Sequence, residues 1–263
     1  MAHAQLACYR GGMVLLIGLS FTMHASAQSL QVGAYISVSG GIAQPATDSL
    51  TRVAAASDGF NREEVRTVSR LGRSGAFDIG GGVVLRKRIT IGAAFDRSSS
   101  ERPADVTLSL THPAFHPTLT ATTVSDPLQR NDSALHVQFG YKVPTREPLS
   151  LTFFGGPSYF TTRQEALTGI NWREPFNSAT RSFSATIGQL ETGTVHASAW
   201  GYNVGVDGGY FFSKHVGVGG MMRYGRATVD LENPLESMAK RRTVSDEAQA
   251  GGLRTAAGLR VRF

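Results

Sequence analysis

The chain has 263 residues, of which 30 are Gly and 17% are charged, and its 26 Lys and Arg exceed its 20 Asp and Glu to give a formal charge of +6. This length suits one large domain, and the composition indicates a β-rich, turn-rich protein and argues against disorder. The Arg residues are scattered over several segments, so we expect no nucleic-acid partner. Anionic lipid head groups are the better candidates for the positive charge.

The amino-terminal segment has the features of a secretory signal peptide. Arg10 supplies a positive charge, residues 11–23 form a short apolar run, and Ala25-Ser26-Ala27 is a small-x-small cleavage site. Because the run is too short to span a membrane as a helix, we expect residues 1–27 to be removed and residues 28–263 to form the mature domain. An uncleaved helical anchor is the alternative. The only cysteine, Cys8, lies in this segment, so the mature chain has no thiol for a disulfide, a metal or a nucleophile.

Eight later segments alternate apolar and polar residues, which is the period of a β-strand. The alternation is cleanest where Leu135, Val137 and Phe139 are separated by His136 and Gln138. The eight segments are residues 30–40, 76–86, 88–97, 134–143, 149–161, 198–212, 216–230 and 251–263. Each reaches the roughly 9–11 residues that a transmembrane strand needs.

Short and long connections alternate between these segments. Residues 86–88, 144–148 and 213–215 are short turns. The long polar loops are residues 42–75, 98–133, 162–195 and 231–252. Within them, residues 63–71 and 236–242 are expected to form short helices. Long loops at one end only are typical of membrane barrels with an even strand number, whereas a soluble lipocalin-like barrel, with its apolar residues inside, would not favour them.

The last segment, residues 251–263, has an apolar face, a face with three Arg, and an aromatic last residue. This ending resembles the closing strand of bacterial outer-membrane β-barrels, whose assembly signal combines an aromatic last residue, alternating apolar residues and an upstream Gly. Phe263, Val261 and Gly258 match that signal, and Ala256 departs from it because the family has a polar residue there. The resemblance implies recognition by the barrel-assembly machinery.

The mature chain as a whole resembles the OmpA/OmpX-type outer-membrane barrels. The resemblance implies an all-β fold, an eight-stranded antiparallel up-and-down transmembrane β-barrel in the bacterial outer membrane. It further implies a monomer in contact with outer-membrane lipid and lipopolysaccharide. We expect no cofactor, no metal and no second domain.

The polar face of the strands predicts what fills the barrel. An eight-stranded barrel has an interior just wide enough for side chains, and a buried charge is tolerated when it is paired. The predicted lumen network consists of Asp78, Asp96 and Asp207 paired with Arg223, Arg254 or Arg260. Arg262 and Lys142 are expected nearer the rim.

Other polar residues give weaker indications of chemistry. His196 and Ser198 share one face of a strand and faintly resemble the His-x-Ser of outer-membrane lipid A deacylases, but Asp207 has the opposite parity, so no orienting acid is evident. His112 and His116 are too few for a metal site. Lys240, Arg241 and Arg242 form a basic patch suited to lipopolysaccharide phosphates.

The sequence therefore predicts an integral outer-membrane barrel that is not an enzyme. Its expected role is structural or surface-interacting, through four long loops and an extracellular ligand that the sequence does not name. A narrow, low-conductance pore for small solutes is the first alternative, and a lipid-modifying hydrolase is the second.

Overall fold

The computed structural model describes residues 32–57, 62–111, 118–231 and 246–263. These residues form fourteen β-strands and include no helix. The predicted signal peptide, His112, His116, the basic patch Lys240, Arg241 and Arg242, and the predicted helix 236–242 lie outside the described residues. Within the described ranges, no helix is long and apolar enough to cross a membrane.

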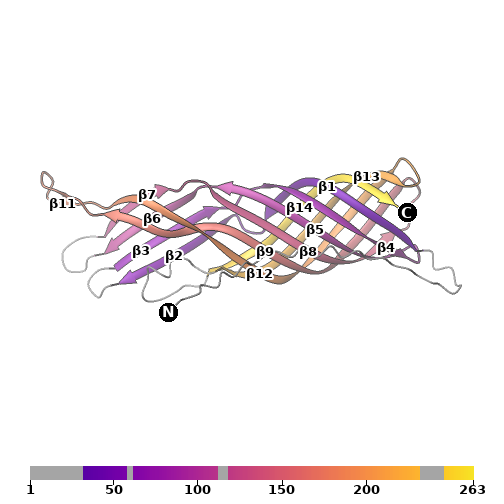
Figure 1. Ribbon diagram of the computed structural model, residues 1–263, viewed down its shortest axis with the longest axis horizontal. Coiled ribbons are helices and arrows are strands. Elements are labelled where there is room, and N and C mark those ends of the chain that lie inside the picture. Colours follow the sequence, from indigo (N-terminus) through magenta and orange to yellow (C-terminus); the bar gives the residue numbers. More distant parts are fainter. Residues whose placement is uncertain (1–31, 58–61, 112–117, 232–245) are drawn as a thin grey trace, which may run out of the picture. The chain divides into compact units, whose positions relative to one another are not determined.

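Eight of the strands close into a barrel, which confirms the predicted fold (Figure 1). They are β1 (Gly33–Pro45), β4 (Ser74–Leu85), β5 (Ile89–Arg102), β8 (Leu128–Val143), β9 (Leu149–Arg173), β12 (Thr186–Phe211), β13 (Val216–Leu231) and β14 (Asp246–Arg262). Every neighbouring pair is antiparallel, and the order around the barrel follows the chain. Closure is made by β1, in which Tyr35 lies opposite Arg262 of β14 and also opposite Gly82 of β4.

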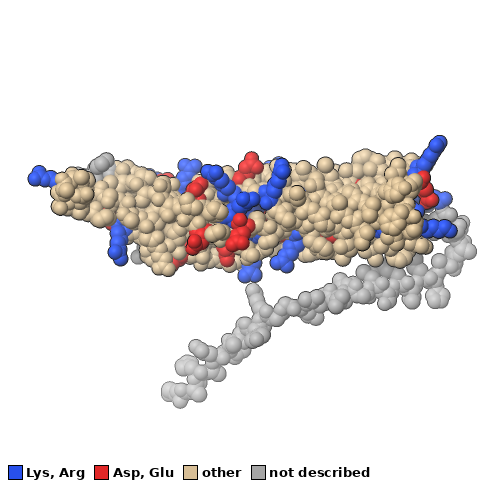
Figure 2. Space-filling view, turned by 90° about the horizontal axis from the view of Figure 1, so that it is seen from above, with Lys and Arg blue, Asp and Glu red and all other residues tan. Residues whose placement is uncertain are grey.

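The faces of these strands have the orientation that the sequence predicts. Outward side chains include Phe139, which is 55% exposed, and Leu259, which is 56% exposed, whereas the inward Ser39, His136 and Asn203 are buried. Figure 2 shows a stretch of surface almost without charged side chains. It lies between the charged groups at the right-hand end of the molecule and those near its middle. An apolar exterior around a polar interior is the reverse of a water-soluble barrel and is typical of a barrel in lipid.

The short turns all lie at one end, which we call the short-turn end; the other is the long-loop end. The turn between β4 and β5 is the shortest of the three, and in it the N–H of Arg88 donates to the carbonyl of Leu85 at 3.1 Å. Arg86 and Lys87 both have positive φ, at 49° and 63°. Two consecutive residues with positive φ are typical of hairpin turns whose backbone twist matches the right-handed twist of the two strands that they join.

The long loops are more ordered than the sequence suggests. The first two loops contain β2 (Ser49–Ser57), β3 (Arg62–Arg70), β6 (Ala104–Thr111) and β7 (Leu119–Val124), which form a four-stranded sheet. In the third loop, β9 and β12 continue far beyond the barrel, and β10 (Phe176–Asn177) and β11 (Ser182–Phe183) form a small hairpin. We call the four-stranded sheet together with residues 162–173 and 186–195 the head.

The predicted helix over residues 63–71 is wrong, because this segment is strand β3. Val65 and Thr67 are buried on one side of β3 while Arg62 and Arg66 are exposed on the other. The alternation produces one buried and one exposed face because β3 pairs with β2 on one side and with β6 on the other. Tertiary packing of this kind overrides local helix propensity.

Two apolar clusters stabilise the long-loop end. The first, the head core, joins Val65, Val106, Leu108 and Leu110 of the sheet to Leu167 and Ile170 of β9. The second, the inner cluster, lies on inward positions and includes Leu50, Phe160, Ala227, Val229 and Ala248. The sequence predicts a polar interior throughout, but towards the long-loop end the inner cluster lies beside buried polar residues such as Arg130 and Thr162.

Candidate functional site: a charged layer in the barrel lumen

The six residues of the predicted network all lie on inward positions of the barrel strands. Asp96 and Arg223 are each 1% exposed, and Asp78, Arg254 and Arg260 are also buried. Asp207 is half-buried and lies closer to the short-turn end. An alternation with period 2 is sufficient to bring all six to the interior, but their pairing depends on the register between strands.

Arg223 and Asp96 form the centre of what we call the charged layer. Nη2 of Arg223 lies 3.1 Å from Oδ2 of Asp96, and it also pairs with the carboxylate of Asp78. Nη2 of Arg254 lies 2.9 Å from Oδ1 of Asp96. Because these groups come from β4, β5, β13 and β14, their ion pairs join strands on different sides of the lumen.

A further ion pair lies between the charged layer and the short-turn end. Nη2 of Arg260 is 2.6 Å from Oδ2 of Asp207, and Nε of the same arginine is 3.1 Å from that oxygen. Nη1 of Arg260 donates to Oγ of Ser39 at 2.7 Å. Two donors on one carboxylate hold the arginine in a fixed orientation.

A buried hydrogen-bonded chain extends the charged layer to β8 and β9. Nε2 of His136 lies 2.7 Å from Oδ2 of Asp96, and Nδ1 of His136 lies 2.7 Å from Oγ of Ser158. Nδ2 of Asn203 donates to Ser158 Oγ at 2.8 Å. All four side chains are buried.

The sequence did not reveal this Ser–His–Asp chain, although its alternation places His136 and Asp96 on the polar face. The sequence does indicate that Ser158 points inward, because it occupies a polar position in the alternation of its strand. Its pairing with His136 is visible only once β8 and β9 are in register. With the Asp on Nε2 and the Ser on Nδ1, the ring nitrogens have the opposite partners from those of a serine hydrolase triad.

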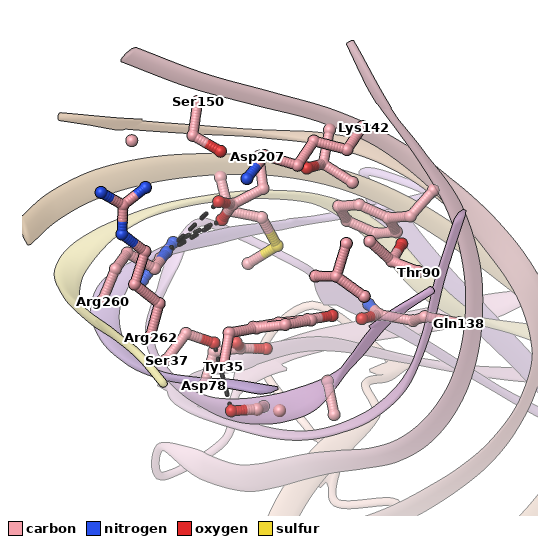
Figure 3. Close-up of a pocket in the computed structure, with 18 of the residues that line it drawn as sticks. Tyr35, Ser37, Asp78, Thr90, Gln138, Lys142, Ser150, Asp207, Arg260 and Arg262 are labelled. Carbon is pink, nitrogen blue, oxygen red and sulfur yellow. Dashed lines mark hydrogen bonds and ion pairs between the residues drawn. The ribbon is translucent and has the colours of Figure 1, made fainter. Parts of the chain in front are cut away.

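A cavity lies on the short-turn side of the charged layer (Figure 3). Its volume is about 100 Å³, and its lining includes Tyr35, Thr90, Gln138, Lys142, Asp207 and Arg223. A much smaller cavity, of about 20 Å³, lies on the long-loop side and is lined by Arg130, Asp132 and Arg254. The charged layer therefore divides the interior, and the inner cluster packs beyond it.

The remaining predicted residues lie at the ends or on the outer surface. Arg262 is at the short-turn end, where Nη2 is 3.1 Å from Glu147 Oε1 and the guanidinium carbon is 4.2 Å from the Phe211 ring centre. Lys142 is half-buried in the lumen. Outward, His196 and Ser198 are exposed, and Ser198 Oγ accepts a hydrogen bond from Tyr159 at 2.8 Å.

The carboxy-terminal residues of the predicted assembly signal have distinct surroundings. Phe263 is 69% exposed, and its backbone N–H donates to the carbonyl of Ala34 at 2.8 Å. Val261 is on the outward parity. At Gly258 a Cβ would overlap the carbonyl oxygen of Val38 and lie 2.6 Å from Ser39 Cα. Close approach of β14 and β1 therefore requires Gly at this position.

No group of three or more His, Cys, Asp or Glu in the described part of the chain is arranged to hold a metal ion. None of the curated proteins with which the sequence was compared is significantly similar to it.

Several solved structures are similar in fold at low sequence identity. OprG from Pseudomonas aeruginosa is 9% identical and has a TM-score of 0.43, with 88% of this chain and 96% of that chain covered. The outer membrane protease OmpT from Escherichia coli is 13% identical and has a TM-score of 0.47, with 90% and 99% covered. Ail, the attachment invasion locus protein of Yersinia pestis, in complex with the heparin analogue sucrose octasulfate, is 13% identical and has a TM-score of 0.36, with 88% and 99% covered.

Likenesses this distant say nothing about what the present chain binds or catalyses. A family model supplies the assignment: the model of the outer membrane protein beta-barrel domain matches residues 13–233, which is most of the sequence. The chain therefore belongs to the outer membrane protein beta-barrel domain family.

Proposed function

We propose that this outer-membrane barrel acts through its head, in a structural or surface-interaction role, and that it is not an enzyme. The observation that carries the proposal is the head core. Val106 and Leu108 are fully buried in it, and Trp172 of β9 donates from Nε1 to Oε1 of Glu63 at 3.0 Å. A head with its own packed core presents a preformed surface, which lowers the entropic cost of binding a partner.

The interior supports a barrel that does not conduct. Arg223, Asp96 and His136 are each 1% exposed and joined to one another through Asp96, so a solute would have to separate buried ion pairs. Separating such a pair leaves an uncompensated buried charge, which costs several kcal/mol. The inner cluster adds a second, apolar obstruction on the long-loop side.

Neither Ser158 nor Ser198 has the environment of a catalytic nucleophile. Ser158 is bonded to a histidine but is 0% exposed, and it lines neither lumen cavity. Ser198 is exposed but bonds to Tyr159, and Asp207 points into the lumen on the other face of β12. A serine hydrolase needs both an accessible hydroxyl and a base with an orienting acid.

The proposal includes the expected partners and processing. Cleavage after Ala27 would release the mature chain, and the barrel-assembly machinery would recognise Phe263, Val261 and Gly258. The assembled monomer would contact outer-membrane lipid, and the basic patch Lys240, Arg241 and Arg242 would contact lipopolysaccharide phosphates.

Adherence measurements test the role of the head. The full chain and a variant in which Asn-Gly turns replace residues 46–73 and 103–127 are displayed at equal levels in a heterologous outer membrane. Cells carrying the full chain should adhere to surfaces coated with extracellular-matrix or serum proteins, and cells carrying the variant should not. Equal adherence of the two would remove the proposed role.

A narrow pore for small solutes is the second candidate, and the cavity on the short-turn side of the charged layer is the observation that favours it. Planar-bilayer recordings separate the two candidates. A closed lumen gives no steady conductance with the full chain, whereas a steady open channel supports the pore.

A further inference from the structure

The cavity on the short-turn side of the charged layer has access to one end of the barrel. Its lining runs from Arg223 in the charged layer to Phe211 and Arg262, which are the last residues of β12 and β14. Figure 3 shows the side chain of Lys142 directed into this space, on the same side as Asp207. A small solute can therefore reach the cavity from the short-turn end without passing the charged layer.

The lining carries more positive than negative charge. Four cationic side chains line it, and they are Lys142, Arg223, Arg260 and Arg262. The lining carboxylates are Asp78 and Asp207 alone. Arg223 pairs with Asp78, Arg260 with Asp207, and Arg262 with Glu147. The side chain of Lys142 forms no ion pair within 4.0 Å among the described residues.

Arg223, one of the residues that line the cavity, has hydrogen-bond donors that are not used. Nε and Nη1 of Arg223 are buried and have no acceptor within the described ranges. In native proteins a buried polar group without a partner usually indicates an ordered water or an ion. Thr90 and Gln138 also line the cavity, and their side chains can donate to a bound ligand.

We propose that this cavity is a binding site for a small oxyanion, a carboxylate or inorganic phosphate, held by Lys142 with Thr90 and Gln138 beside Arg223. At about 100 Å³ the cavity exceeds several times over the ~10–15 Å³ that one water requires, which leaves room for an ion the size of acetate. A cation is disfavoured because both lining carboxylates are already paired and Lys142 would repel it. A charge-assisted hydrogen bond from Lys142 would hold the oxyanion.

The site is independent of the proposed function of the head, because it lies on the opposite side of the charged layer. Binding from the short-turn end also requires no conduction through the lumen. The test below measures binding of the ion and not conductance. Its failure would leave the proposed role of the head untouched, and a failure of that role would leave the site untouched.

The experiment is an NMR titration of the full mature chain in an uncharged maltoside detergent at constant ionic strength. Sodium acetate and sodium phosphate are added in separate arms, and the Nε–H resonance of Arg223 and the side-chain amide of Gln138 are followed. We expect saturable shifts of both resonances. Saturation by acetate alone identifies a carboxylate site, and saturation by phosphate, alone or with acetate, identifies a site that accepts phosphate.

Three variants locate the site. Lys142→Gln should weaken binding at least about tenfold, because it removes a charge-assisted bond. Lys142→Arg keeps the charge and should retain binding. Lys214→Gln changes an exposed residue of the turn between β12 and β13, outside the cavity, and should leave binding unchanged.

Absence of saturable shifts in both arms overturns the proposal. It is also overturned if Lys142→Gln binds as tightly as the unaltered chain, since the ion would then be held elsewhere. A difference in gel migration between unheated and heated samples verifies that each variant is folded before it is titrated.

Discussion

Arg223 of β13 and Asp96 of β5 are on strands that lie diametrically opposite each other in the barrel, with three strands between them on either side. Their Nη2 and Oδ2 atoms are 3.1 Å apart. The charged layer thus ties the two halves of the closed sheet together through side chains, in addition to the hydrogen bonds between neighbouring strands. Substitutions in the charged layer should therefore affect the stability of the whole barrel.

Asp96 accepts contacts from His136, Arg223 and Arg254, so its removal leaves two arginines short of a buried acceptor. Asp96→Ala should lower the free energy of unfolding by about 3–5 kcal/mol, which is typical of breaking a buried ion pair. Urea titration of the barrel in phospholipid vesicles measures this loss. Asp230→Ala, at an exposed position of β13, is the matched control and should change stability by less than about 0.5 kcal/mol.

Ser158→Ala tests whether the Ser–His–Asp chain is structural. The change leaves Nδ1 of His136 and Nδ2 of Asn203 without their hydroxyl partner, and it should cost about 1–3 kcal/mol of stability. The exposed Ser198→Ala should cost less, because water replaces the hydrogen bond to Tyr159. Acyl release from lipid A should be absent from the full chain and both variants; release that disappears in either variant would argue for an enzyme.

Gly258→Val tests whether Gly258 is needed for the packing of β14 against β1 or for recognition by the barrel-assembly machinery. A side chain there would overlap the Val38 carbonyl, so the barrel should be destabilised by about 1–3 kcal/mol, as in an overpacked core. Refolding of the purified chain into vesicles should then fail or slow without any assembly machinery. Ala257→Val, on the exposed neighbouring position, should refold normally. Normal refolding of Gly258→Val with poor assembly in cells would assign Gly258 to recognition alone.

The turn between β4 and β5 offers a stabilising change. Arg86 and Lys87 have positive φ, which costs an L-residue about 1–2 kcal/mol and suits Asn-Gly. Replacing Arg86-Lys87 by Asn-Gly should raise the free energy of unfolding by about 1 kcal/mol. Urea titration in vesicles measures the gain. Lys214→Gly is the control. Lys214 is not one of the described non-Gly residues with positive φ, so this substitution should not raise the free energy of unfolding.

Leu108→Ala tests the independence of the head core. The side chain is 0% exposed, and its truncation should cost about 2–5 kcal/mol locally. Trypsin should then cut β3 at Arg66 faster while the barrel continues to migrate as a folded species. Val124→Ala, at a residue that is 61% exposed, should not change the cleavage rate. Unfolding of the barrel together with the head would show that the two form one cooperative unit.

The sequence determined the features of this protein that depend on one strand at a time. Alternation with period 2 identified the eight barrel strands, and residues such as Phe139 and His136 were assigned to opposite faces because side-chain direction follows parity. The short turns followed from the same pattern. Each of these properties depends on only a few consecutive residues.

Only the tertiary structure decided how distant strands meet. Register between β8 and β9 brought Ser158 to His136, and closure of the barrel brought Arg223 to Asp96. The segment around Val65 became strand β3 through pairing with β2 and β6, although its local sequence favoured a helix. Such outcomes depend on contacts between residues far apart in the chain, and a shift of one residue between two strands would move every side chain of a strand to the other face.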